Sequence, residues 1–275
     1  MAFKRLIKII ICSILAFLIL AIAIIYIPQR FMAHRNEAFV PDYPRVELTP
    51  DTDYETVFLQ TGLGRSAVDK LKADGDFEAI TEAQNQFFKT PEIECAPMFD
   101  WFTREDRMKD DEFLGFADLQ IGDILVTLST HSFGWRHGHA AIVIDEYTVL
   151  ECQQMGMDVS LEGIYYWNNY SNWAVLRPKN VTIEQQEAVC EFALSKLKGK
   201  PYNILSGIFG RKAPDINDEN TGFYCTNLIW YAWNHLGIDL DSDGGKIVTA
   251  YDLLHSDKLE VVQLYGMDPR DFLGN

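Results

Sequence analysis

The sequence predicts an α+β protein in which a small antiparallel β-sheet or barrel packs against helices and follows one transmembrane helix. An uncharged run near the N-terminus, 9–27, is long and apolar. Several short apolar runs separated by turn residues follow one another between residues 119 and 178, which is typical of antiparallel strands. Segments with helical apolar spacing precede and follow this block. We therefore expect a membrane anchor at 1–28, a linker and helical region at 29–118, and the main domain at 119–275.

Composition and charge limit the functions to consider. The chain has 275 residues, 48% hydrophobic and 23% charged, which is a globular composition. Its net charge of −16 argues against nucleic-acid binding and against docking on anionic lipid. The five cysteines contain no C-x-x-C pair, so neither a zinc ribbon nor a disulfide framework is expected, and most should be buried thiols.

The N-terminal run has the features of an uncleaved anchor. It can cross a bilayer core of about 30 Å as a helix. Lys4, Arg5 and Lys8 precede it, and the exit at Pro28 lacks the small residues of a signal-peptide cleavage site. The basic residues on the N-terminal side favour a cytoplasmic N-terminus and an extracytoplasmic domain.

Residues 29–118 offer no evident chemistry. Prolines punctuate 39–53, which predicts an extended linker, and helices are expected at 66–71 and 77–88, packing on the main domain. A cluster of acidic and basic residues over 104–112 is expected to form a solvated face.

The main domain starts with strands and ends with helices. We expect helices starting near Thr182 and at Cys225, the second ending at about His235. The expected strands are 124–128, 137–144, 147–152, 158–161 and 173–178.

One predicted hairpin places an imidazole beside a carboxylate. If it closes around Asp145 and Glu146, His139 lies opposite Glu151 or Cys152, with a register uncertain by one residue. A base and the acid that orients it require this arrangement. A buried histidine that serves only the core is the alternative for His139.

Cys225 is the candidate nucleophile. It lies in the first turn of an amphipathic helix, where the helix dipole and unpaired N–H groups favour a thiolate. A small buried hydrophobe is the alternative. The apolar stripe of this helix should pack on the sheet and bring the thiol to the open end of the hairpin.

A metal site is a further alternative. His137 and His139 share one face of a strand and could bind zinc, with a third ligand from Glu151, His131 or Cys225. No further ligand motif supports this reading, so we expect no metal or other cofactor.

Several motifs occur in an order that carries a family resemblance: GDILV, GHAAIVID, VLECQ, WAVLRP, GKPYN, FYCTNLIWYAWNHLGIDL and YDLL. The sequence resembles, over 119–265, the circularly permuted branch of the NlpC-type cysteine hydrolases, the YiiX/YebB-like group. The resemblance implies a permuted papain-like fold with Cys225 as nucleophile, His139 as base and Glu151 as the third, polar residue. It also suggests Tyr224 and Tyr202 for substrate contact or oxyanion support.

These observations together predict a membrane-anchored cysteine hydrolase that cleaves an amide bond. An extracytoplasmic location makes cell-wall (murein) peptides, and so peptidoglycan, the expected substrate. One alternative is a thiol-dependent lipid or ester hydrolase or an acyltransferase acting on acyl-bearing substrates, with an aromatic rim at the membrane formed by 165–167, Tyr170 and Trp173. Another is a non-catalytic binding protein on the same fold.

Overall fold

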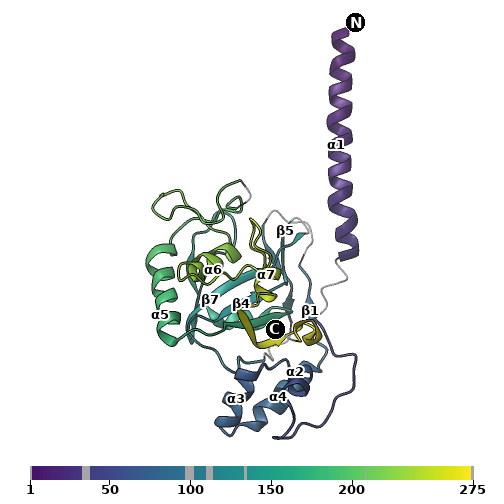
Figure 1. Cartoon of the computed structure of the whole chain (residues 1–275). Helices are drawn as coiled ribbons and strands as arrows, with labels where there is room; N and C mark the ends of the chain where they lie inside the picture. Colours follow the sequence, from purple (N-terminus) through teal and green to yellow (C-terminus); the bar gives the residue numbers. More distant parts are fainter. Residues whose placement is uncertain are drawn as a thin grey trace.

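The computed structural model describes residues 2–32, 38–96, 102–109, 114–132, 135–207 and 209–273. It confirms an α+β chain, built on a six-stranded antiparallel sheet with the order β11-β10-β4-β7-β8-β9 (Figure 1). The strands are β4 (Ile124–Thr127), β7 (His139–Asp145), β8 (Thr148–Glu151), β9 (Ser160–Gly163), β10 (Trp173–Pro178) and β11 (Leu259–Tyr265).

Two strand groups were not expected from the sequence. β11 pairs with β10 along its whole length, with a bulge between Val175 and Leu176. Short strands form two smaller sheets: β1 (Ile93–Glu94) with β3 (Arg107–Met108), and β2 (Arg104–Glu105) with β5 (Thr130–Ser132) and β6 (Trp135–Arg136).

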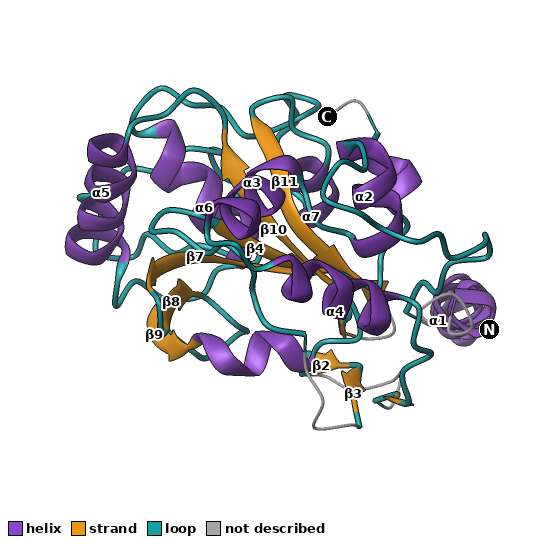
Figure 2. Cartoon of the chain, turned by 90° about the horizontal axis from the view of Figure 1, so that it is seen from below, coloured by secondary structure: helices purple, strands orange, loops and turns teal. Residues whose placement is uncertain are grey.

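Helices cover both faces of the main sheet (Figure 2). One face carries α5 (Ile183–Phe192), which continues as a π-turn over Ala193–Leu197, together with α6 (Cys225–Asn234) and α7 (Ala250–Leu254). The other carries α2 (Tyr54–Thr61), α3 (Arg65–Ala73), α4 (Phe77–Phe87) and the 3-10 helix η2 (Ile164–Asn169). A second 3-10 helix, η4 (Pro269–Phe272), lies near the C-terminus.

The helix starts follow from their caps. Thr182 and Gln185 form a reciprocal capping box at the start of α5, and Asp53 and Asp76 accept backbone N–H groups at the starts of α2 and α4. The predicted start at Ser66 is replaced by Gly64, which precedes α3. A Cβ on Gly64 would lie 1.8 Å from the carbonyl oxygen of Val261, so only glycine lets α3 approach β11 here.

The N-terminal region shares a core with the sheet. Val57, Val68 and Ile80 pack in one apolar cluster with Leu125 and Val143. Burial of this kind contributes about 1.5–3 kcal/mol for each large apolar side chain. The helices of residues 54–87 therefore stabilise the face of the sheet that they cover.

The charged cluster at 104–112 differs from the prediction. Asp106 is 1% exposed, and its carboxylate accepts hydrogen bonds from Arg136 at 2.7 Å and from the backbone N–H of Ala96 at 2.9 Å. Residues 110–112 lie outside the described residues. The expectation of a solvated face is wrong for Asp106, because its cationic partner comes from β6, a strand that the sequence did not predict.

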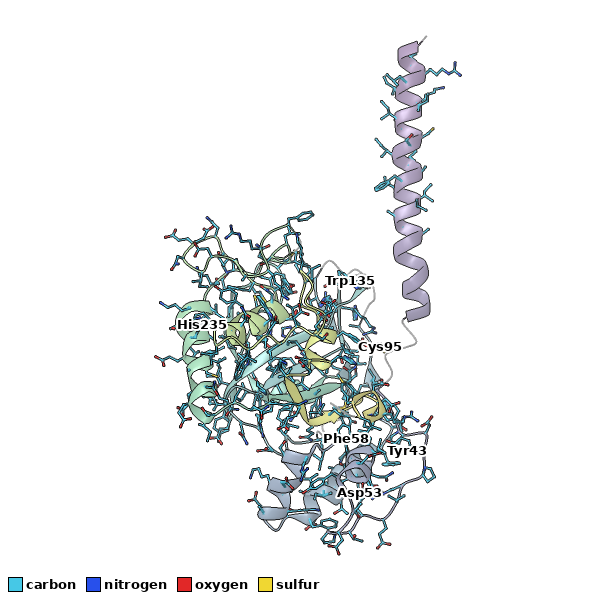
Figure 3. All side chains as sticks on the ribbon, in the orientation of Figure 1. Tyr43, Asp53, Phe58, Cys95, Trp135 and His235 are labelled. Carbon is cyan, nitrogen blue, oxygen red and sulfur yellow. The ribbon has the colours of Figure 1, made fainter. Side chains whose placement is uncertain are left out.

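The N-terminal helix α1 (Ala2–Met32) contains a segment, Lys4–Ala23, that is long and apolar enough to span a membrane. Figure 3 shows its side chains projecting on all sides, and those described are mostly exposed. Within Lys4–Ala23 the share of the helix buried inside the structure is 0%.

A buried arginine ties the start of the main domain to the sheet. Arg177 on β10 bonds Asp123 through Nε and Nη2, at 2.8 and 2.7 Å, and Asp118 through Nη1 at 2.7 Å. Burial raises the pKa of Asp123 to about 6 despite the opposing effect of this guanidinium. The loop that enters β4 is thereby fixed by charge as well as by packing.

We expect Arg177→Met to lower the free energy of unfolding by about 3–5 kcal/mol, because two buried aspartates lose their cation. Urea unfolding of the full chain in detergent, followed by tryptophan fluorescence, measures the change. The matched control is Arg270→Met, since Arg270 pairs with Asp42 and Asp268 at the surface and its loss should lower the free energy of unfolding far less. Equal costs for the two variants would contradict this account.

Candidate active site

The β7–β8 hairpin has a different register from the predicted one. Ala141, not His139, pairs with Glu151, because the two-residue turn begins one residue later than expected and Ile144 is bulged out between Val143 and Asp145. His139 therefore lies diagonal to Glu151, on the same face of the sheet. The change leaves the two side chains in contact, because a two-residue displacement preserves the face.

Gly138 determines how the chain enters β7. Its φ is +72°, and a Cβ there would lie 2.5 Å from the Cβ of Ala250 and 2.8 Å from the carbonyl oxygen of Thr127. Only glycine satisfies both the backbone conformation and the close approach. Gly138 thus allows His139 to start the strand directly opposite Thr127.

Cys225 is the first residue of α6, as the sequence predicted. Tyr224 stands at the N-cap position, and within the described chain its side chain makes no capping hydrogen bond. The helix packs on the sheet through Leu228 and Ile229. Cys225 itself is 6% exposed, at a helix end whose N–H groups and dipole favour negative charge.

The structure brings Cys225, His139 and Glu151 together. Nε2 of His139 lies 3.0 Å from Oε2 of Glu151, and the imidazole lies close enough to Cys225 to interact with it electrostatically. Since Nε2 faces the carboxylate, Nδ1 is the nitrogen left to meet the sulfur. The ring of Trp167 stacks on the imidazole, with centroids 5.4 Å apart and an interplanar angle of 16°. The imidazole is thus held between a thiol and a carboxylate.

Charge within the site favours the ionised forms of His139 and Glu151. Burial disfavours the imidazolium, but the charge of Glu151 and the hydrogen bond with Cys225 outweigh it and raise the pKa of His139 to about 10. Burial likewise opposes the charge on Glu151, yet its contacts with His139 keep the pKa of Glu151 below the usual value. The imidazolium and the carboxylate thus lie together next to Cys225 at the start of α6.

The other cysteines differ from Cys225. Cys152 and Cys190 are also buried, and their thiols donate to the carbonyls of Phe223 and Val143, each at 3.4 Å. Burial raises the pKa of Cys152 well above its usual range and that of Cys190 to about 12. Cys12 and Cys95 are exposed. Three of the five are therefore buried, and two of those three have the features of inert core thiols.

Tyr224 and Tyr202 both lie close to Cys225. The Tyr224 hydroxyl accepts the backbone N–H of Val248 at 2.9 Å, and burial raises the pKa of Tyr224 to about 12. Tyr202 pairs with Phe223 in a parallel bridge, and burial, then the charge of Cys225, raises the pKa of Tyr202. Contact of either ring with a substrate stays a prediction.

The expected aromatic rim is not formed. Trp167, Tyr170 and Trp173 are buried, and only Tyr165 is largely exposed. Tyr166 is half-buried, and its hydroxyl donates to Oε1 of Glu151. This contact was not predicted from the sequence, although a run of aromatic residues directly follows β9.

Among the described histidines, His131 and His137 do not join His139 in a metal site. His137 contacts Ser132 Oγ through Nε2, at 2.9 Å, and the carbonyl oxygen of Gly138 through Nδ1, at 2.7 Å, so both its ring nitrogens are engaged. His131 is buried with Nε2 3.6 Å from Asp106. In the described parts of the chain, these rings do not converge with His139, Glu151 or Cys225 as metal ligands.

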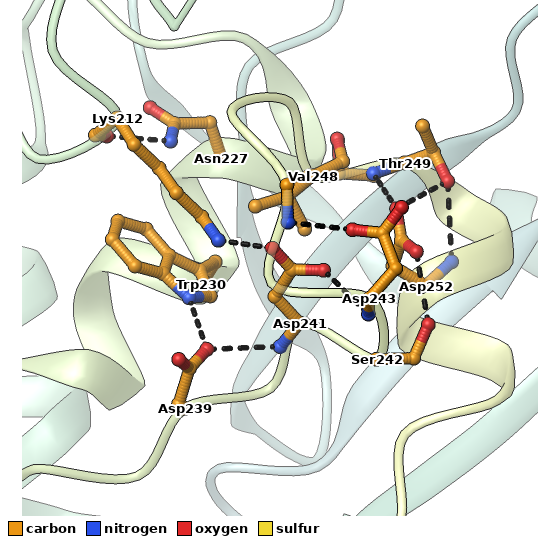
Figure 4. Close-up of polar contacts among 12 residues, drawn as sticks. Lys212, Asn227, Trp230, Asp239, Asp241, Ser242, Asp243, Val248, Thr249 and Asp252 are labelled. Carbon is orange, nitrogen blue, oxygen red and sulfur yellow. Dashed lines mark hydrogen bonds and ion pairs between the residues drawn. The ribbon is translucent and has the colours of Figure 1, made fainter.

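A carboxylate cluster does lie beside α6 (Figure 4). Oxygens of Asp241, Asp243 and Asp252 lie within 4.8 Å of one another, close enough to hold a cation. Here Lys212 pairs with Asp241, while Asp252 accepts hydrogen bonds from Ser242 and Thr249. The alternating aspartates before Gly244 are the sequence signal for such a cluster.

The loop carrying this cluster braces the start of α6 around Cys225. Asp239 accepts the indole N–H of Trp230 at 2.7 Å, and the Thr226 hydroxyl donates to the carbonyl of Val248 at 2.6 Å. With the bond from Val248 to Tyr224, the loop holds α6 on both sides of Cys225. The position of the thiol thus depends on contacts far from it in sequence.

Comparison with known proteins gives little further information. No family model matches the sequence, and no curated protein matches it. One solved structure, described as metalloprotein yiiX from Escherichia coli O157:H7, aligns with a TM-score of 0.38 and 16% identity over 52% of this chain and 96% of that chain. Similarity at this level carries no argument about fold or function.

We expect His139→Gln to destabilise the protein by about 3–5 kcal/mol near pH 6, because Glu151 loses its buried partner. Because the pKa of His139 is raised, the imidazolium contributes its full stabilisation to the folded state below pH 6.5. This stabilisation is lost as the pH rises through about 10. The difference in unfolding free energy between wild type and variant should therefore narrow from pH 6.5 to 10.

Urea unfolding in detergent at several pH values measures this difference. His235→Gln is the control, since that exposed ring stacks on Phe192 with centroids 3.8 Å apart. A constant difference for His139→Gln over this pH range would show that the ion pair does not contribute as described.

Proposed function

We propose that the protein is a membrane-anchored cysteine hydrolase that cleaves amide bonds. The observation that carries this proposal is the connected set Cys225–His139–Glu151, in which one imidazole contacts both a thiol at a helix start and a buried carboxylate. A histidine that served only the core would need neither the thiol nor the helix end. The same set argues against a non-catalytic binding protein.

The reaction would proceed through an acyl-enzyme. The Cys225 thiolate attacks the carbonyl carbon and forms a C–S bond. The backbone N–H of Cys225 helps to hold the oxyanion; such donors are worth about 2.7–4 kcal/mol each in the transition state. The C–N bond then breaks, and the His139 imidazolium gives its proton to the leaving amine. His139 next takes a proton from water, whose oxygen attacks the thioester and releases the thiolate.

Glu151 keeps the imidazole in the productive orientation. Its Oε2 receives the Nε2 hydrogen, which leaves Nδ1 to exchange a proton with the sulfur and the leaving group. Without this acceptor the ring could rotate or take the other tautomer.

The order of these residues supports a permuted papain-like arrangement, since the base and the acid precede the nucleophile along the chain. The resemblance of the motifs to the permuted NlpC-type hydrolases supports peptide amides as substrates. An anchor with basic residues on its N-terminal side supports an extracytoplasmic domain, where murein peptides are accessible. A lipid or ester substrate loses the support of an aromatic rim, because most of those rings are buried.

We expect iodoacetamide at pH 7 to alkylate Cys225 about tenfold or more faster than the exposed Cys95, because an ordinary thiol is only a few per cent thiolate at this pH. Peptide mass spectrometry of the full chain in detergent gives both rates at once. His139→Gln should lower the alkylation rate of Cys225 to that of Cys95. Equal rates at the two cysteines in the wild type would overturn the assignment of the nucleophile.

A substrate assay separates the hydrolase classes. We expect murein peptides to be cleaved and short lipid esters to be left intact, with Cys225→Ala inactive. Cys190→Ala, which changes a buried thiol on α5, is the matched control and should retain activity. Cleavage of lipid esters alone would replace the amidase by the lipid-acting alternative.

A further inference from the structure

Glu151 has a second set of partners that orienting the imidazole does not account for. Its Oε2 faces His139, whereas Oε1 accepts the Tyr166 hydroxyl and, at 2.6 Å, Nε2 of Gln153. A carboxylate with donors on both oxygens cannot rotate about its terminal bond without breaking one of these contacts. The plane of the Glu151 carboxylate is thus set from the side away from the imidazole.

We propose that Tyr166 is a positioning residue for Glu151 and that Arg107, from the N-terminal region, holds Tyr166 in place. This inference rests on the proposed function and adds to it a part of the chain in which the sequence showed no chemistry.

Tyr166 has the protonation state that this role requires. Burial, followed by the charge of Glu151, raises the pKa of Tyr166 above its usual range, so the phenol keeps its hydrogen and donates it to the carboxylate. The neighbouring Tyr165, by contrast, has an exposed ring, so adjacent tyrosines in this run have different surroundings.

Arg107 supports the aromatic pair that carries this donor. Its guanidinium carbon lies 5.7 Å from the ring centroid of Tyr166 and 5.2 Å from that of Tyr170, within the range of cation–π attraction. The two rings meet edge to face with centroids 6.0 Å apart. Glu105 pairs with Arg107 and accepts the Tyr170 hydroxyl at 2.9 Å. Charged and aromatic groups therefore alternate from Glu151 to Glu105.

Backbone contacts fix the register of this support. Arg107 and Tyr170 form an antiparallel bridge, and the N–H of Ser171 donates to the carbonyl of Asp106 at 3.2 Å. The N–H of Thr103 donates to Oε1 of Gln154 at 3.2 Å, just beyond the end of β8. Residues 103–107 thus contact both the segment just after β8, which contains Gln153, and the segment after η2 that supports Tyr166.

The test uses the pH dependence of Cys225 alkylation, which requires no known substrate. The full chain in detergent is treated with iodoacetamide from pH 4 to 9, and the Cys225 peptide is quantified by mass spectrometry. Loss of one hydrogen bond to the charged carboxylate should move the acidic limb of the rate profile upward by about one pH unit in Tyr166→Phe. Tyr165→Phe is the matched control and should leave the limb in place.

Thermal unfolding checks that each variant is folded. Arg107 is half-buried and contacts the same tyrosine. Arg107→Met should therefore move the acidic limb of the Cys225 alkylation profile in the same direction. If Tyr166→Phe does not fold, Arg107→Met takes its place as the test. An unmoved limb in the folded variant, with rapid alkylation of Cys225 in the wild type, overturns the positioning role alone. Slow alkylation in the wild type overturns the proposed function instead.

Discussion

The contact between the His139 imidazole and the Glu151 carboxylate is the interaction on which the rest of the site depends. Both side chains are almost completely buried, and removing two ionisable groups from water costs several kcal/mol for each ion. That cost is tolerable only if each group finds its partner in good geometry. The hairpin register, the glycine before β7, the stacked Trp167 and the donors to Oε1 all serve this geometry.

Buried ion pairs also occur elsewhere in the fold. The chain carries a net charge of −16, yet several of its aspartate side chains are buried, and some of these pair with cations from distant segments. Asp123 pairs with Arg177, Asp106 with Arg136, and Asp241 with Lys212. Each pair joins elements that are not neighbours in sequence. Buried charge therefore determines how loops join the sheet, while the apolar clusters supply most of the stabilisation.

Local patterns predicted the parts of the fold that local physics determines. The apolar runs of β4, β7 and β10 and the start of α6 at Cys225 follow from strand patterning and helix-start signals. The exact register did not follow, because a bulge at Ile144 depends on packing across the sheet. β11 was missed because it is a C-terminal segment whose pairing with β10 is long-range.

The three candidate residues of the site could be predicted, but their surroundings could not. Cys225, His139 and Glu151 stand at recognisable places: a helix start, a strand start and a strand end. Asp106 and Tyr166 were misjudged because their environment comes from chain segments far away in sequence. A charged or aromatic residue in a short irregular segment gives no local indication of which partner will cover it.

The sequence separation of the three residues has a consequence for biosynthesis. His139 and Glu151 meet through a hairpin that closes over a short stretch of chain, so this contact can form early. Cys225 emerges much later, and its helix must dock on the sheet and be braced by residues 239–252 before the thiol reaches the imidazole. The nascent polypeptide consequently carries an ordinary cysteine until its C-terminal third has been made. The proposed reactivity of the thiol would then report that folding is complete.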